Sequence, residues 1–202
     1  MARRSDPDAG ELRRNQILDA AMPVFARLGF EHARMDDIVE ASGLSKGALY
    51  WYFKSKEEII TGILHRLFKI DIEQLRGLLD IEGTVSERLL MLTRYRIAGL
   101  KHVSHLIPIF VEFYALTVRE DWVRQFISEY FRDFRGLLID LIQQGIDREE
   151  FRPVSATATA VTISALYEGL MVHWLVDPEV VEWDVVGEGS VQLLLEGIKA
   201  QP

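Results

Sequence analysis

The sequence contains no cysteine. Disulfide bonds, thiolate metal sites and cysteine nucleophiles are therefore excluded, and the composition suits a cytoplasmic protein. Arginines occur at the N-terminus without an apolar run behind them, so we expect no secretory signal. We find no apolar stretch of about 18 residues and expect no membrane span.

Motifs for catalysis are also missing. The sequence has no glycine-rich phosphate loop, no G-x-S-x-G and no H-E-x-x-H. His65, His102 and His105 have acidic neighbours, which leaves metal or acid–base chemistry as an alternative, but solvated surface histidines explain them better. We therefore predict that the protein is not an enzyme and has no catalytic residue, metal or cofactor.

The formal net charge is −8, and it is unevenly distributed. Residues 1–56 carry nine Lys or Arg and eight Asp or Glu, whereas residues 57–202 carry 14 and 23. The first quarter of the chain is thus close to neutral and the remainder is acidic. This division allows an acidic protein to present one surface to a polyanion such as DNA.

The segment from Met35 to Ile60 is the most informative part of the chain. It predicts a short helix over residues 35–41, a turn at Gly43 and a second helix over residues 46–53 that begins after Ser45. Ser55 and Glu58 form an S-x-x-E capping box at the start of a third helix. This order of elements is typical of a helix-turn-helix, which holds one helix in the major groove of DNA.

The outward face of the second helix suits a phosphate backbone. Three lysines and no acid lie between Ser42 and Lys56, and the apolar Leu49 and Phe53 are spaced to face a core. The alternative is that the aromatic side chains simply pack on neighbouring helices. Arg3 and Arg4 could add a minor-groove arm, although a frayed tail explains them as well. The predicted DNA-binding residues are Arg34, Ser45, Lys46, Gly47, Ala48, Tyr50, Trp51, Tyr52 and Lys56.

The segment and the helix before it resemble the DNA-binding signature of the TetR family of bacterial repressors. The matching positions are Ile17, Ala20, Ala21, Phe25, Gly29 and Phe30, then Ile38, Ala41, Gly43, Leu44, Ser45, Gly47, Leu49, Tyr50, Tyr52, Phe53, Ser55, Lys56 and Glu57. Val39, Ser42 and Arg34 depart from the family pattern, and Trp51 is bulkier than most members carry. Arg34 replaces the usual capping threonine or serine, so it could add a phosphate contact instead.

The resemblance implies an all-α fold with two domains. We expect a helix-turn-helix DNA-binding domain over residues 1–54 and a helical effector-binding and dimerisation domain over residues 55–202. Thr84 and Glu87 form a second capping box. Apolar periodicity and capping signals predict helices over residues 11–28, 56–79, 85–101, 105–118, 121–146, 155–176 and 186–200, in addition to the two of the motif. Gly145, Asp147 and Pro153 are expected to mark a break.

The last two helices carry more apolar residues than one buried stripe needs. In the resembled family these helices form a four-helix bundle across a two-fold axis, which implies a homodimer that binds a palindromic operator on double-stranded DNA. The alternative is that both helices are buried all round within one chain. The apolar positions are Leu166, Leu170, Val172, Leu175, Val191, Leu193, Leu194, Leu195 and Ile198.

Residues 95–134 are rich in aromatic side chains. Core packing is their ordinary role, and the resemblance implies a cavity for a small, largely apolar effector that releases a repressor from DNA. Polar anchors for such a ligand would come from the following helix. The predicted ligand-binding residues are Tyr95, Phe110, Phe113, Tyr114, Phe126, Glu168 and His173. The rival hypothesis is a helical binding or scaffold protein that retains the motif without DNA recognition.

Overall fold

The computed structural model describes residues 7–79 and 81–200, without the side chains of residues 7–9 and 105. Arg3 and Arg4 therefore lie outside the described residues. Within these ranges the chain is helical, as predicted, and no strand is present. One isolated antiparallel bridge joins Phe151 to Lys199.

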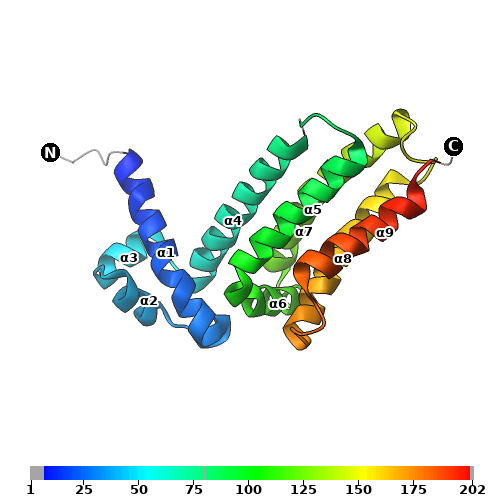
Figure 1. Ribbon diagram of the computed structural model, residues 1–202. Coiled ribbons are helices and arrows are strands. Elements are labelled where there is room, and N and C mark those ends of the chain that lie inside the picture. The colour runs from blue at the N-terminus through cyan, green and yellow to red at the C-terminus, as the bar shows by residue number, and fades with distance from the viewer. Residues whose placement is uncertain (1–6, 80, 201–202) are drawn as a thin grey trace. The chain divides into compact units, whose positions relative to one another are not determined.

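Contacts divide the chain into two compact units, Met1–Ile70 and Asp71–Pro202. The first contains α1 (Pro7–His32), α2 (Met35–Ser42), α3 (Lys46–Tyr52) and the start of α4 (Lys56–Leu79), as Figure 1 shows. The packing boundary falls inside α4. The domain boundary predicted after residue 54 lies at the end of the helix-turn-helix motif. It describes functional domains and remains a prediction.

The first unit is built on the apolar stripe of α1. Ile17, Ala21 and Phe25 are fully buried, and α1 packs against α2. At Gly29 the backbone reaches φ 73°, a conformation that favours glycine. The helix predicted to end there therefore breaks at Gly29, although helical turns continue to His32.

The second unit contains the rest of α4, α5 (Val85–His102), α6 (Ile107–Leu116), α7 (Asp121–Asp147), α8 (Ala156–Val176) and α9 (Glu188–Ile198). Helix α7 packs against α8, and α5 packs against α7 and α9 (Figure 1). The helix expected over 105–118 is shorter, because Ser104–Leu106 form a separate 3-10 turn and Pro108 lies in the first turn of α6.

Helix ends follow the predicted capping residues with one shift. Thr84 and Glu87 exchange both bonds of a capping box, with Glu87 N 3.2 Å from Thr84 Oγ1 and Thr84 N 2.9 Å from a Glu87 carboxylate oxygen. At the start of α4 the N–H of Glu58 donates to Ser55 Oγ. The Glu58 carboxylate accepts instead from the N–H of Lys54, one residue further back than in the standard box.

The break predicted around Gly145, Asp147 and Pro153 is confirmed, because α7 ends at Asp147. Gly145 itself lies inside α7, as the helix predicted over residues 121–146 implied. A Cβ atom at Gly145 would lie 2.3 Å from the ring of Phe151, so the glycine is needed for close packing rather than for a turn.

Helix α8 corrects the expectation that no segment is long and apolar enough to span a bilayer. By length and composition it passes that test, alone among the helices within the described residues. Ile163, Tyr167 and Met171 on one face are buried in the core of the second unit. Core helices of soluble proteins commonly meet the same criterion, so α8 is weak evidence for a membrane.

Candidate nucleic-acid interface and effector site

Helices α2 and α3 meet at a tight turn. Gly43 has φ 66°, the left-handed conformation expected at a helix end, and Ser42 Oγ accepts from the N–H of Leu44. Ser45 then caps α3, because its Oγ accepts from the N–H of Ala48 at 3.2 Å. The predicted order of helix, glycine turn and capped helix is therefore present.

Helix α3 has a buried face and an open face. Leu49 and Phe53 are fully buried, whereas 77% of the Trp51 surface is exposed. No heavy atom outside the immediate backbone lies within 4 Å of where a Gly47 side chain would begin. The open face thus combines a large aromatic ring with a position that has no side chain, which allows close approach of another molecule.

Charged groups around α3 make contacts within the same unit. The Lys46 ammonium lies 2.7 Å from a carboxylate oxygen of Asp36, and both side chains are mostly exposed. The hydrogen bond and charge of Asp36 raise the pKa of Lys46. Lys54 donates to the carbonyl of Tyr50 at 2.6 Å. Because these contacts are exposed, exchanging them for phosphate oxygens costs little.

Lys56 and Arg34 occupy different surroundings from those the sequence suggested. The Lys56 ammonium donates to the carbonyls of Phe30, Glu31 and Ala33 at 2.7, 2.8 and 3.3 Å, which matches all three of its N–H groups. Its predicted contact with phosphate remains a prediction. Exposed Arg34 precedes α2 and gives it no side-chain cap, and its backbone N–H donates to the Asp37 carboxylate, which is the reciprocal half of a capping box.

Helix α1 holds the end of α3 in place. The Arg14 guanidinium donates to the carbonyl of Tyr52 at 3.4 Å and lies 4.3 Å from the centre of the Phe53 ring. Gln16 donates to the carbonyl of Ser42 at 3.1 Å. Contacts from α1 thus fix both ends of the segment that carries the open face. Tyr50 and Tyr52 are half-buried beside Trp51.

The predicted effector residues lie in the second unit but in unlike settings. Phe113 is buried with its ring edge-on to Trp122, and Tyr114 stacks on Phe131 at a centroid distance of 6.1 Å. The Tyr95 hydroxyl donates to Gln74. Phe110, Phe126 and Glu168 are partly buried, and His173 is exposed.

A buried polar cluster joins α4, α5 and α7 next to these aromatics. The Arg96 guanidinium lies 2.6 Å from an Asp71 carboxylate oxygen, and the Tyr130 hydroxyl lies 2.8 Å from the same oxygen. Burial disfavours the charge of Arg96, but Tyr130 and Asp71 outweigh it and raise its pKa. The guanidinium also stacks on the rings of Phe134 and Tyr167. This cluster ties the second half of α4 into the bundle.

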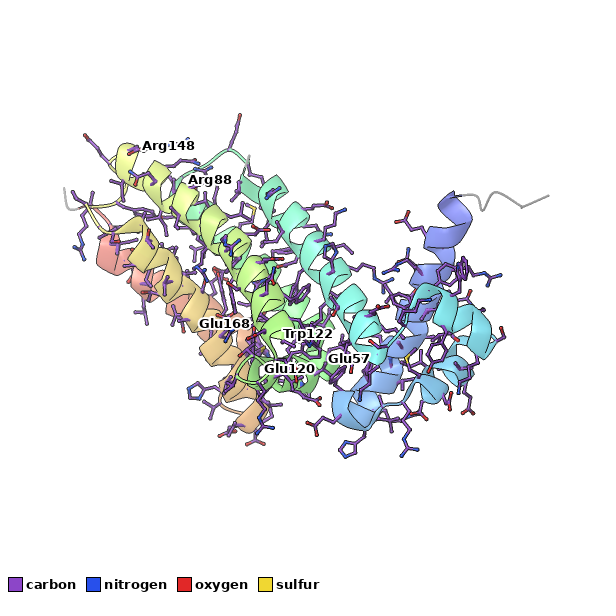
Figure 2. All side chains as sticks on the ribbon, turned by 180° about the vertical axis from the view of Figure 1, so that it is seen from behind. Glu57, Arg88, Glu120, Trp122, Arg148 and Glu168 are labelled. Carbon is purple, nitrogen blue, oxygen red and sulfur yellow. The ribbon has the colours of Figure 1, made fainter. Side chains whose placement is uncertain are left out.

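Glu168 on α8 faces the same interior, as Figure 2 shows. Burial raises its pKa to about 7, against the opposing charges of Arg96 and Arg135. Its carboxyl group also raises the pKa of Tyr114, although burial is the larger cause. Near neutral pH the Glu168 carboxyl group is therefore partly protonated; the protonated form can donate a hydrogen bond, and the ionised form can only accept. Glu168 makes no ion pair with another described residue.

Sequence reasoning missed Arg96, Asp71 and Tyr167 as polar members of the interior. A signal was present for Arg96, which follows Leu92 by four residues and Thr93 by three and so continues the buried stripe of α5. The hydroxyl groups of Thr93 and Tyr167 lie 2.8 Å apart in that interior. Only packing reveals this contact, because the two residues are far apart in the sequence.

Comparisons with known proteins agree with this arrangement. Residues 17–63 match the family of bacterial regulatory proteins described as the tetR family, and residues 97–189 match the C-terminal region of BetI-type transcriptional repressors. The HTH-type transcriptional regulator YfiR of Bacillus subtilis is 36% identical over 153 residues, which cover 73% of this chain and 72% of the relative.

Solved structures show the same fold. A transcriptional regulator from Saccharomonospora viridis in complex with choline is 20% identical with a TM-score of 0.84, covering 95% of this chain and 100% of that one. FadR of Bacillus subtilis in complex with stearoyl-CoA is 22% identical with a TM-score of 0.80, covering 91% and 98%. With both regions matched and a relative at this identity, the chain belongs to the TetR family of transcriptional regulators.

Proposed function

We propose that the protein is a cytoplasmic homodimeric repressor that binds a palindromic operator and is released by a small, largely apolar effector. The observation that carries the DNA-binding part is the open face of α3, where Trp51 is 77% exposed above the buried Leu49 and Phe53. An exposed aromatic side chain on a short helix that α1 anchors is available to contact another molecule. Base edges and thymine methyl groups in a major groove are suitable partners for it.

A gel-shift titration with DNA from upstream of the protein's own gene tests this part. We expect wild-type protein to bind that DNA in preference to unrelated DNA, and Trp51→Ala to lose at least about tenfold in affinity. Val118→Ala is the matched control, because Val118 is 84% exposed and belongs to the second unit. Equal affinity of both variants, or no sequence preference, would favour a scaffold role over DNA recognition.

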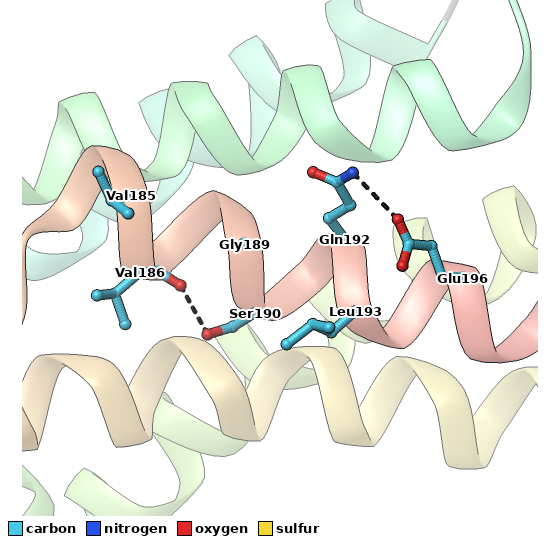
Figure 3. A pocket seen from close by; sticks show the side chains of 7 residues that line it. All are labelled: Val185, Val186, Gly189, Ser190, Gln192, Leu193 and Glu196. Carbon is cyan, nitrogen blue, oxygen red and sulfur yellow. Dashed lines mark hydrogen bonds between the residues drawn. The ribbon is translucent and has the colours of Figure 1, made fainter.

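Exposed apolar residues on α8, on α9 and in the π-helical turn Trp183–Gly187 that precedes α9 support the dimer. Val176, Val185 and Leu193 are 79%, 62% and 72% exposed. Figure 3 shows Leu193 and Val185 beside a shallow pocket of about 410 Å³ on α9, with Ser190 and Gln192 also in its wall. A monomer gains nothing from such a surface, whereas a second copy of the same two helices covers it.

Sedimentation velocity at micromolar concentration tests the dimer. We expect the wild-type chain to sediment as a dimer and Leu193→Asp to sediment as a monomer, because a charge on the covered face is desolvated without a partner. Val118→Asp, which changes an equally exposed valine outside α8 and α9, is expected to remain dimeric. A monomeric wild-type chain would exclude the proposed pairing.

The aromatic interior of the second unit supports the effector. The packed rings of Phe113 and Tyr114 belong to an apolar interior that a ligand would have to enter. The partly buried Glu168 supplies one polar group there that can donate or accept near pH 7. Such a site selects an apolar body with a single polar anchor. Stearoyl-CoA and choline, which are bound in the two solved relatives, are suitable first probes.

Thermal shift followed by the gel shift tests the effector. A true effector raises the melting temperature and lowers the affinity for DNA, because it stabilises the state that binds DNA poorly. Glu168→Gln should alter the affinity for probes with an ionic group more than for uncharged probes. A ligand that stabilises the protein without changing DNA affinity would not be an effector.

A further inference from the structure

A second pocket lies at the end of the second unit where α4 ends and α5 begins, away from the aromatic interior. Its volume is about 590 Å³, and polar side chains dominate its wall. The volume falls within the range of small-molecule sites, which is roughly 300–1,000 Å³. The charged and amide residues that line it are Glu82, Arg88, Asp140, Gln144 and Arg148.

Arg88 is a buried cation in this wall. It is only 5% exposed, and its guanidinium donates to the carbonyl of Leu79 at 2.7 Å and to Gln144 Oε1 at 3.1 Å. Its Nε is buried and has no hydrogen-bond partner in the part of the chain that the structure describes. Both partners are neutral, and no carboxylate among the described residues lies within ion-pair distance of Arg88. A buried charge without a counter-charge is costly, so a bound anion would stabilise it.

Two further donors face the same space. The Gln144 side chain lines the pocket, and its carbonyl oxygen accepts from Arg88 while its amide N–H groups make no bond with a described residue. Arg148 makes only a long contact of 4.0 Å with Glu150 and keeps 53% of its side chain exposed. Figure 2 shows Arg88 and Arg148 at the same end of the unit.

The two acids in the wall act against an anion but do not cancel the donors. Glu82 and Asp140 are exposed, so water solvates their charges, whereas the charge of Arg88 is shielded from water. Coulombic interaction with a ligand is strongest for the buried group, because the surrounding dielectric is lower there. The pocket therefore favours an anion, and Asp140 limits its affinity.

We propose that this pocket binds the oxyanion head group, phosphate or carboxylate, of a small metabolite between Arg88, Gln144 and Arg148. Guanidinium groups suit such oxyanions because their N–H groups match two oxygens at once. The site is separate from the proposed effector site, since none of the predicted effector residues lines it. The inference also stands if the DNA-binding proposal fails.

Calorimetric titration of the full-length protein with sodium phosphate and with sodium citrate tests the proposal, with sodium chloride at equal ionic strength as the reference. We expect saturable binding of at least one oxyanion and none of chloride. Arg148→Ala should weaken binding about tenfold, and Asp140→Asn should strengthen it several-fold, because these changes remove one attraction and one repulsion. The stronger of the two probes identifies the head group.

Arg132→Ala is the matched control, because Arg132 is an exposed arginine on α7, the helix that Arg148 directly follows, and it does not line the pocket. Arg88 itself is left unchanged, since its bond to the end of α4 makes loss of folding a competing explanation. Absence of saturable binding of either probe overturns the proposal. Equal affinities of the Arg148→Ala and Arg132→Ala proteins overturn it as well.

Discussion

The ammonium nitrogen of Lys56 lies 2.7 Å from the carbonyl oxygen of Phe30 and 4.7 Å from the centre of the Phe30 ring. A side chain at the start of α4 thereby closes the end of α1, whose last carbonyls would otherwise lack partners. The positive charge of Lys56 is also stabilised there by the partial negative charge at the C-terminal end of a helix. The contact accounts for a lysine at this position without any DNA.

We predict that Lys56→Ala destabilises the protein as well as weakening operator binding. Loss of charge-assisted hydrogen bonds from a partly buried lysine should lower the free energy of unfolding by roughly 1–3 kcal/mol. Urea unfolding of the mutant and wild-type proteins measures this difference in the free energy of unfolding. Weakened DNA binding at unchanged stability would instead show that Lys56 acts mainly on phosphate.

Gly47→Ala separates stability from recognition. The space around Gly47 is open, and alanine is a better helix former than glycine. The Gly47→Ala change should therefore raise the free energy of unfolding by about 0.5–1 kcal/mol. The added methyl group occupies the open face, so operator affinity should fall. A urea titration measures the expected gain in stability, and a gel shift on the same preparation measures the expected loss of operator affinity. A stabilised protein with unchanged affinity would place Gly47 away from the DNA.

Glu168 makes stability depend on pH. The folded chain holds its proton up to about pH 7, whereas an unfolded glutamate releases it near 4.5, so the folded state binds more protons between these values. Stability contributed by the neutral group is complete at low pH and is lost as the pH rises to about 7. The full pH-dependent change in the free energy of unfolding is roughly 3 kcal/mol, since each pKa unit corresponds to about 1.4 kcal/mol.

Glu168→Gln keeps the neutral shape at every pH. We therefore expect the mutant to be more stable than wild type at about pH 8 and similar to it at about pH 5, measured by urea unfolding at one protein concentration. If the stability of both proteins changes with pH in the same way, titratable groups other than Glu168 cause the pH dependence.

Two glycines of α7 give opposite predictions. A Cβ at Gly145 meets the Phe151 ring at 2.3 Å, so Gly145→Ala should cost roughly 1–3 kcal/mol or more. Nothing lies within 4 Å of a Cβ at Gly136, so Gly136→Ala should stabilise the helix by up to about 1 kcal/mol. Thermal unfolding of both mutants is the measurement, and equal shifts would contradict the role given to Phe151.

Local signals predicted most of the fold. Caps at Ser45 and Thr84, the turn at Gly43 and the apolar spacing in α1 depend on residues a few positions apart, so the sequence alone reveals them. The packing role of Gly145 could not be predicted, because a glycine near a helix end and a glycine that admits a neighbouring ring look alike in a sequence. The ring belongs to Phe151, and only the packed structure brings it there.

The candidate sites were predicted less completely. Residues of α3 could be assigned to a buried or an open face from their spacing, but Lys56 contacts carbonyls of another helix that spacing does not reveal. Arg88 and Arg96 were passed over because arginines are rarely buried. Both continue the apolar stripe of α5, so a basic residue at a stripe position is the signal to examine in related sequences.

The exposed valines and leucine of α8 and α9 also link the amount of this protein to its persistence. In the proposed dimer, folding and association share one equilibrium, so the melting temperature rises with protein concentration. If the protein forms this dimer, unpaired chains at low copy number keep Val176 and Leu193 exposed and are more open to proteolysis than paired ones. The proposed repressor would then be cleared when scarce and last once it accumulates, which would sharpen the onset of repression.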